Sequence, residues 1–99
     1  MKPRRVRFTE TARDHVHREQ SWWIENRVHV DLFATEFEDA LHVLKLLPGS
    51  GTPYPRAGVP SLRRIYLRKV ACHIYYTFDE REVIVRARWG AFRGHGPAV

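Results

Sequence analysis

The sequence contains a single cysteine, Cys72, so it forms neither an internal disulfide nor a metal site built from several cysteines. It has no apolar run near the roughly 18 residues that a membrane-spanning helix needs. The basic beginning, residues 1–7, is not followed by an apolar stretch with a small-residue cleavage site. These absences predict a cytoplasmic protein that has no membrane partner.

The length and composition predict one globular domain. A chain of 99 residues can bury one modest core, and 43% hydrophobic with 28% charged residues is typical of a folded protein. We therefore expect a single domain over residues 1–99. Residues 90–99 include three glycines and a proline, so we expect them to form a flexible C-terminal tail.

Acidic residues are scarce in the second part of the chain. Residues 1–55 hold eight cationic and eight acidic residues, whereas residues 56–99 hold nine cationic and three acidic ones, so the net charge of +6 arises after residue 55. Fourteen of the seventeen cationic residues are arginine, whose forked guanidinium suits phosphate and carboxylate groups. The partner is therefore expected to be anionic, either nucleic acid or an acidic protein segment.

Helical signals follow a short first strand over residues 4–8. Thr9 is the expected N-cap of a helix that runs to about Arg27, and Asp31 is the expected cap of a second helix. About three residues separate the two helices, which predicts an antiparallel hairpin. The apolar stripe of the second helix consists of Phe33, Phe37, Ala40, Leu41, Leu44 and Leu47.

After Leu62 the hydrophobic period changes to two, which predicts strands over residues 62–68, 71–78 and 82–89. The predicted fold is α+β, in the order β-α-α-β-β-β. An N-terminal strand is followed by an antiparallel helical hairpin packed on one face of a mostly antiparallel four-stranded sheet. The strand alternation places Ile65, Leu67, Val83, Val85 and Ala87 toward the helices, and Arg64, Tyr66, Arg68, Arg86 and Arg88 on the opposite, open face.

This order of elements, with several short motifs, resembles the RelE/ParE superfamily of bacterial type II toxins over nearly the whole chain. The final stretch, Trp89 to Pro97, resembles the tails of ParE-like plasmid-stabilisation proteins. The motifs that carry the likeness are Thr9-Glu10-Thr11-Ala12, the end of the second helix with Pro48 and Gly51, Arg63-Arg64, Ile74-Tyr75-Tyr76 and Val83 to Trp89.

The resemblance implies a small growth-inhibiting toxin that is neutralised by a cognate antitoxin. RelE-like members cleave messenger RNA on the ribosome, whereas ParE-like members are associated with inhibition of DNA gyrase and lack the nuclease residues. RelE-like members tend to carry lysines after the second helix, and residues 48–68 contain none. This difference favours the ParE-like branch, with a RelE-like ribosome-dependent endoribonuclease as the alternative. A third interpretation is a plain nucleic-acid-binding module.

Cleavage of RNA by its own 2′-hydroxyl requires an acid, a base and cations. The acid–base candidates are His73, His95 and Tyr75, and His95 is favoured because a tail can fold over the basic face. For a nuclease the predicted catalytic residues are His95, Arg88, Arg86 and Arg64. The predicted binding residues in either case are Arg64, Tyr66, Arg68, Arg86, Arg88 and Arg93. The alternative role of these arginines is a surface patch that binds an acidic antitoxin.

The six histidines do not suggest a metal site. His15 and His17 are two residues apart on a predicted helix and so face different directions, and no pair has the spacing of helical zinc ligands. We therefore expect no metal and no small-molecule cofactor, and we expect Cys72 to be an inert core residue.

Overall fold

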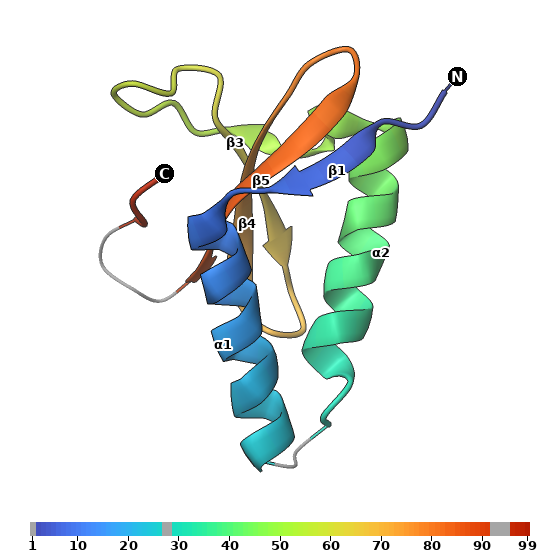
Figure 1. The fold of residues 1–99 in the computed structure, drawn as a ribbon, viewed down its shortest axis with the longest axis vertical. Coiled ribbons are helices and arrows are strands. Elements are labelled where there is room, and N and C mark those ends of the chain that lie inside the picture. Colours follow the sequence, from blue (N-terminus) through green and yellow to red (C-terminus); the bar gives the residue numbers. More distant parts are fainter. Residues whose placement is uncertain (1, 27–28, 92–95) are drawn as a thin grey trace.

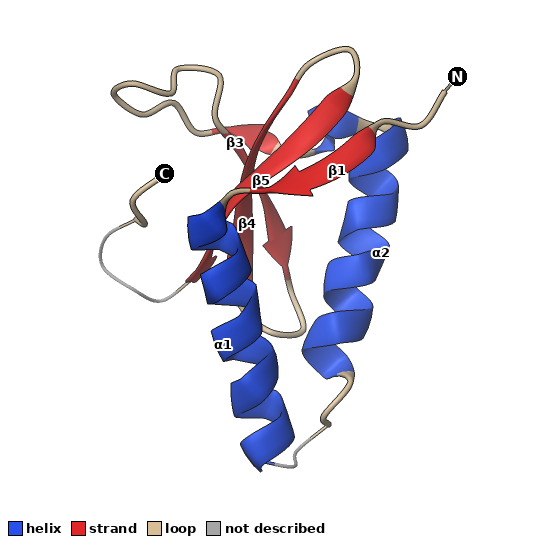
Figure 2. Cartoon of the chain, in the orientation of Figure 1, coloured by secondary structure: helices blue, strands red, loops and turns tan. Residues whose placement is uncertain are grey.

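The computed structural model describes residues 2–26, 29–91 and 96–99 (Figure 1). Two helices lie on one side of a five-stranded sheet whose strand order is β1-β5-β4-β3-β2 (Figure 2). β1 runs parallel to β5, and the other neighbouring strands are antiparallel. The elements are β1 (Arg5–Phe8), α1 (Glu10–Asn26), α2 (Leu32–Leu46), a 3₁₀ turn η1 (Pro48–Ser50), β2 (Thr52–Pro53), β3 (Arg63–Leu67), β4 (Cys72–Phe78) and β5 (Glu82–Gly90).

The predicted α+β order is confirmed, with one added strand. β2 has only two residues and pairs with the start of β3, where Thr52 lies opposite Arg64. The sequence did not predict β2, because the proline and glycine residues around it favour irregular structure. Its pairing with β3 also joins residues that are separated in the sequence, which no local pattern indicates. The sheet therefore has five strands rather than the predicted four.

The helix boundaries follow the predicted caps closely. The Thr9 hydroxyl accepts a hydrogen bond from the amide of Ala12 at 3.1 Å, which satisfies one of the free amides of the first turn of α1. Asp31 occupies the N-cap position of α2, but its side chain makes no capping hydrogen bond. The assignment of Leu47 to the apolar stripe is wrong, because α2 ends at Leu46 and the Leu47 side chain is 59% exposed. No helix in the described part of the chain is long and apolar enough to cross a membrane.

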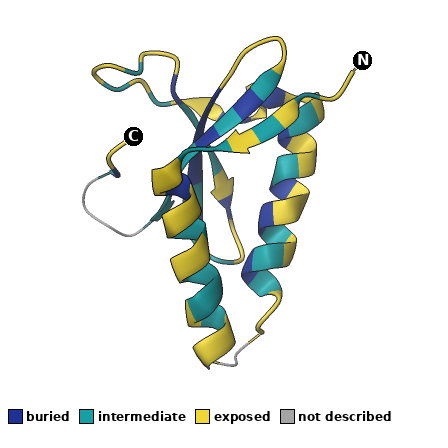
Figure 3. Cartoon of the chain, viewed as in Figure 1, coloured by how far each residue is buried: buried dark blue, intermediate teal, exposed yellow. Residues whose placement is uncertain are grey.

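The main core fills the space between the helices and the sheet, where the buried faces of both helices turn inward (Figure 3). Phe33 and Phe37 stack with ring centroids 5.4 Å apart. Farther along α2, the fully buried Leu44 packs with Tyr76 of β4 and Val83 of β5. The predicted apolar face of α2 is therefore the face that covers the sheet.

Tyr76 connects this core to the turn after α2. Its hydroxyl donates a hydrogen bond to the Pro48 carbonyl at 2.6 Å and accepts one from the Gly51 amide at 3.0 Å. A side chain at position 51 would collide with that hydroxyl, because its Cβ would lie 2.5 Å away. Glycine at this position thus allows the η1 turn to approach the sheet closely.

A β-bulge divides β5 into two parts. Tyr76 lies opposite Val85, but the preceding Tyr75 lies opposite Ala87, so Arg86 is an extra residue in the ladder. Before the bulge, Val85 packs in the core beneath the helices. After it, Ala87 packs with Tyr75 and Leu62 on the other side of the sheet. The prediction that Ala87 faces the helices is therefore wrong, because one extra residue reverses the alternation.

Candidate functional site

The face of the sheet opposite the helices, here called the open face, carries a group of basic and aromatic side chains from three strands. The Arg64 guanidinium of β3 reaches the Tyr75 hydroxyl of β4 at 3.4 Å. The Arg86 Nε of β5 donates a hydrogen bond to the Thr77 hydroxyl of β4 at 3.0 Å. Three of the predicted binding residues, Arg64, Tyr66 and Arg86, therefore lie on this face.

Arg64 is held by stacking as well as by its hydrogen bond. Its guanidinium carbon lies 4.3 Å from the centroid of the Tyr54 ring, and the guanidinium of Arg56 lies 4.9 Å from the same ring. The Arg56 Nη2 also donates a hydrogen bond to the Tyr54 hydroxyl at 3.1 Å. Tyr54 thus orders two cations at the edge of the open face through cation–π contacts.

His73 lies near the start of β4, between two tyrosines of the open face. Its ring centroid is 5.1 Å from that of Tyr66 and 6.0 Å from that of Tyr75. Partial burial lowers the pKa of His73 below its usual value of 6.5, and the positive charge of Arg64 lowers the pKa further. The imidazole is therefore neutral at pH 7 and able to accept a proton or a hydrogen bond.

Arg88 does not share this face, so its predicted position on the open face is wrong. The bulge at Arg86 turns Arg88 toward α1, where its Nη1 lies 3.2 Å from a carboxylate oxygen of Glu19. Its backbone amide donates a hydrogen bond to the Nδ1 of His15 at 3.1 Å. Arg88 thus connects β5 to α1 through both its side chain and its backbone amide.

Cys72 lies close to this ion pair and is completely buried. Burial raises the pKa of its thiol to about 11, although the positive charge of Arg88 opposes the rise. A thiol with so high a pKa is protonated at neutral pH and is a poor nucleophile. This agrees with the expected role of Cys72 as a core residue.

The remaining predicted residues lie elsewhere. Arg68 is exposed in the turn that follows β3. Arg93 and His95 fall outside the described residues. The described end of the tail approaches the segment after β2, because Gly96 lies against the Arg56 guanidinium and Pro97 is buried (Figure 1).

β1 adds two arginines to the open face that sequence reasoning missed. Val6 and Phe8 pack toward the core, so the alternating Arg5 and Arg7 project to the other side. Arg7 forms an ion pair with Glu82 of β5 at 3.2 Å, and this contact raises the pKa of Arg7. The alternation of Arg5 and Arg7 with Val6 and Phe8 is visible in the sequence. The parallel pairing of β1 with β5 is not, because it joins segments from opposite ends of the chain and no local pattern predicts it.

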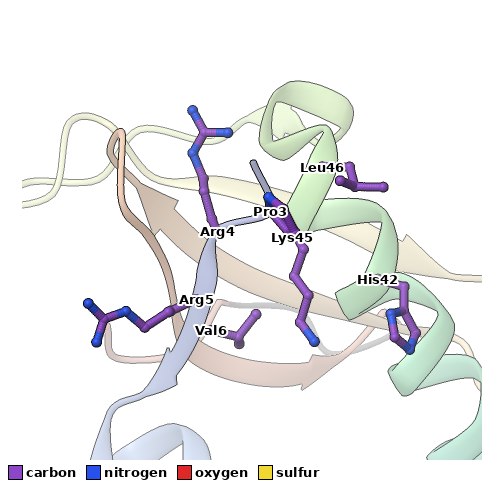
Figure 4. Close-up of a pocket in the computed structure, with 7 residues that line it drawn as sticks. All are labelled: Pro3, Arg4, Arg5, Val6, His42, Lys45 and Leu46. Atoms are coloured by element: carbon purple, nitrogen blue, oxygen red, sulfur yellow. The ribbon is translucent and has the colours of Figure 1, made fainter. Parts of the chain in front are cut away.

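A second surface feature is a groove between β1 and the end of α2, here called the β1–α2 groove (Figure 4). It has a volume of about 710 Å³. In Figure 4 the side chains of Val6 and Lys45 lie between the strand and the helix, and none of the described lining residues is acidic. The lining consists of Pro3, Arg4, Arg5, Val6, His42, Lys45 and Leu46.

Metal ligands do not gather in the described ranges, where no three histidine, cysteine or acidic side chains cluster closely enough to hold an ion. The open face carries guanidinium, imidazole, phenol and hydroxyl groups, together with the Glu82 carboxylate that pairs with Arg7. Such a set suits binding of an anion or proton transfer near one.

Two solved structures share this arrangement of helices and strands. A chain of the toxin–antitoxin complex RelBE2 from Mycobacterium tuberculosis is 24% identical, with a TM-score of 0.64, and the match covers 92% of this chain and 95% of that one. A chain of the chromosomal ParDE toxin–antitoxin system from P. aeruginosa is 12% identical, with a TM-score of 0.66, covering 88% of this chain and 95% of that one. The protein therefore has the RelE/ParE-like fold expected from its sequence. No model of a known protein family matches the sequence, and no curated protein is significantly similar to it.

Proposed function

We propose that this protein is the toxin of a type II toxin–antitoxin system. The observation that carries the proposal is the match of nearly the whole fold to chains from two toxin–antitoxin complexes. The net charge of +6 and the basic open face add to it, because a surface of this kind fits an anionic target or an acidic antitoxin. Both expected targets, DNA gyrase and the ribosome, are cytoplasmic, and we propose that the protein acts there.

Within this class, we favour inhibition by binding, in the ParE manner, with DNA gyrase as the expected target. Arg88 pairs with Glu19 beneath α1, and Arg64 is stacked on Tyr54, so two of the predicted catalytic cations are already engaged. Residues 48–68 also lack the lysines typical of the nuclease branch. The open face is therefore better suited to recognition than to stabilising the charge of a phosphorane.

A RelE-like endoribonuclease is the second candidate, and His73 is the observation that favours it. This imidazole is neutral at pH 7, adjoins two tyrosines and lies on the same face as Arg64 and Arg86. A neutral imidazole beside guanidinium groups is a reasonable base for a 2′-hydroxyl. In this alternative, His73 takes the proton-transfer role that the sequence assigned to His95.

The deciding experiment is induction of the protein in bacteria, with and without the product of the adjacent gene. Cleavage of messenger RNA on ribosomes and supercoiling by gyrase are scored in parallel. We expect growth arrest with a supercoiling defect, no RNA cleavage and rescue by the neighbouring protein. RNA cleavage that disappears in His73→Ala or His95→Ala would replace the ParE-like proposal with the nuclease. Unaffected growth in all strains would contradict the toxin proposal.

A further inference from the structure

The end of the chain, residues 96–99 and here called the tail end, lies against the loop that follows β2 (Figure 1). The backbone of Gly96 approaches the Arg56 guanidinium so closely that a Cβ at position 96 would collide with the Arg56 Nη2. The next residue, Pro97, is buried, whereas the last two residues are exposed. The tail end therefore covers part of the Arg56 guanidinium.

The loop holds Arg56 in place before any ligand binds. The backbones of Arg56 and Val59 exchange two hydrogen bonds, at 3.2 and 2.9 Å. Gly58 between them has a positive φ of 81°, which suits the third residue of a type II turn. The amide of Tyr54 donates a hydrogen bond to the carbonyl of the buried Leu62 at 2.9 Å, which connects the loop to β3. A cation that is already fixed loses little freedom when it binds an anion.

Tyr54 joins Arg56 to the open face. Its ring centroid lies 4.9 Å from the guanidinium carbon of Arg56 and 4.3 Å from that of Arg64. Two cations at one ring concentrate positive charge, and guanidinium groups bind phosphate oxygens through paired hydrogen bonds. The edge of β3 at Arg64 is already paired with β2, so a peptide finds no free strand edge there. A phosphate group therefore fits this position better than an extended acidic peptide.

We propose that the tail end makes an autoinhibitory contact: it covers a phosphate site formed by Arg56 and Arg64 at the Tyr54 ring, and it must leave before a phosphate group binds there. If Arg56 moved aside, it would lose its contact with the Tyr54 ring and its hydrogen bond of 3.1 Å with the Tyr54 hydroxyl. The tail end and the ligand therefore compete for one guanidinium. A tail end that is docked in about nine molecules of ten weakens the apparent affinity about tenfold.

The phosphate group has two possible sources, free phosphate and the backbone of a single-stranded nucleic acid. The second source also uses the Tyr66 ring, which is 45% exposed on the same face and offers a surface on which a base stacks. This inference rests on the proposed function only in taking the open face as the binding surface. Binding to the purified full chain tests it without a measurement of toxicity.

The test compares the chain with its tail end docked and released. Gly96→Val places a side chain where the Arg56 guanidinium lies and should release the tail end, whereas Ala98→Val is the matched control at an exposed position of the same segment. The probes are inorganic phosphate, a labelled single-stranded oligonucleotide and an acidic peptide of the same charge. We expect Gly96→Val to bind the phosphate probes about three to ten times more tightly, with no change in Ala98→Val. A chain shortened by residues 96–99 should show the same gain.

Equal affinity of the unaltered protein and Gly96→Val for the phosphate probes would overturn the autoinhibitory contact. Failure of both phosphate probes to bind the released chain would overturn the phosphate site. A larger gain for the acidic peptide would overturn the choice of phosphate. Binding of both phosphate probes supports a site for a single phosphate group, and binding of the oligonucleotide alone supports a site for nucleic acid.

Arg56→Gln tests which group the tail end covers. Without the guanidinium, adding Gly96→Val should bring no gain in affinity, and a gain that persists in the double variant would overturn the role of Arg56. The ¹⁵N heteronuclear NOE of Ala98 reports whether the tail end is docked. We expect this NOE to fall in Gly96→Val, and also in the unaltered protein as the oligonucleotide saturates it. Saturation without a change at Ala98 would overturn the competition.

The outcomes separate this inference from the proposed function. A protein that arrests growth, but whose affinity for the phosphate probes does not change in Gly96→Val, would overturn the inference while the proposed function stands. A protein that shows the gain in affinity and its dependence on Arg56, but does not arrest growth, would support the inference and contradict only the proposed function.

Discussion

On the helix side of the sheet, Leu44, Tyr76 and Val83 are completely buried, whereas on the open face Tyr66 is 45% exposed and Arg64 is held by ring and hydroxyl contacts. Both sets of residues come from the same strands and the adjoining helix or loop. The open face has its own small buried cluster of Leu62, Tyr75 and Ala87, but beside it the charged and aromatic side chains stay partly accessible. Substitutions at matched positions on the two sides should therefore separate stability from binding.

The largest expected effect lies under α2. Leu44→Ala should lower the free energy of unfolding by about 2–5 kcal/mol, because it removes a fully buried side chain and leaves a cavity. Leu47→Ala is the matched control, since that side chain is 59% exposed and should change stability by less than about 0.5 kcal/mol. Denaturant unfolding measures both, and similar losses in the two variants would contradict the placement of the core.

Substitutions of Arg86 and Arg88 test whether the bulge places these two arginines on opposite sides of the sheet. Arg88→Met should cost about 1–3 kcal/mol, because it leaves the poorly exposed Glu19 carboxylate without its cation. Arg86→Met removes a hydrogen bond to Thr77 on the open face and should cost about 1 kcal/mol or less. If instead Arg88→Met weakens binding of an anionic partner and leaves stability intact, Arg88 belongs on the open face after all.

Replacing either of two neighbouring tyrosines, Tyr75 or Tyr76, with phenylalanine removes the same hydroxyl group, and the expected losses of stability are smaller. Tyr76→Phe should cost about 1–2 kcal/mol, because the Pro48 carbonyl and the Gly51 amide lose their buried partner. Tyr75→Phe removes a longer, 3.4 Å contact with Arg64 from a residue that is also buried, and should cost about 0.5–1 kcal/mol. Thermal or denaturant unfolding of the two variants measures the difference, and a reversed order would show that the hydroxyl network of the turn is not stabilising.

The smallest expected effect is on the pKa of His73. His73 should titrate below its usual value of 6.5, since burial and the Arg64 charge both disfavour the imidazolium ion. As the pH falls, His73 takes up a proton in the unfolded chain before it does so in the folded protein. The free energy of unfolding is therefore unaffected by His73 above about pH 6.5 and decreases as the pH falls toward the pKa of the folded protein. NMR of the imidazole resonances should show a partial rise of the pKa in Arg64→Ala. An unchanged pKa in that variant would remove Arg64 as a cause.

The sequence alone determined most of the core and the order of helices and strands, apart from the short strand β2. The reason is that Phe33, Phe37 and Leu44 recur at the spacing of one helix face, and Val83 and Val85 recur at the spacing of one strand face. Such patterns are local, because a single helix or strand must bury one side. Arg64, Tyr66 and Arg86 were placed on the open face by the same argument.

Only the tertiary structure decided the position of Arg88, the addition of Arg5 to the open face and the existence of the β1–α2 groove. Each depends on how segments distant in the sequence pair with one another. The extra residue at Arg86 is defined only against β4, and the free edge of β1 only by its pairing with β5. Strand register and sheet edges are properties of paired strands, so no periodicity within a single segment specifies them.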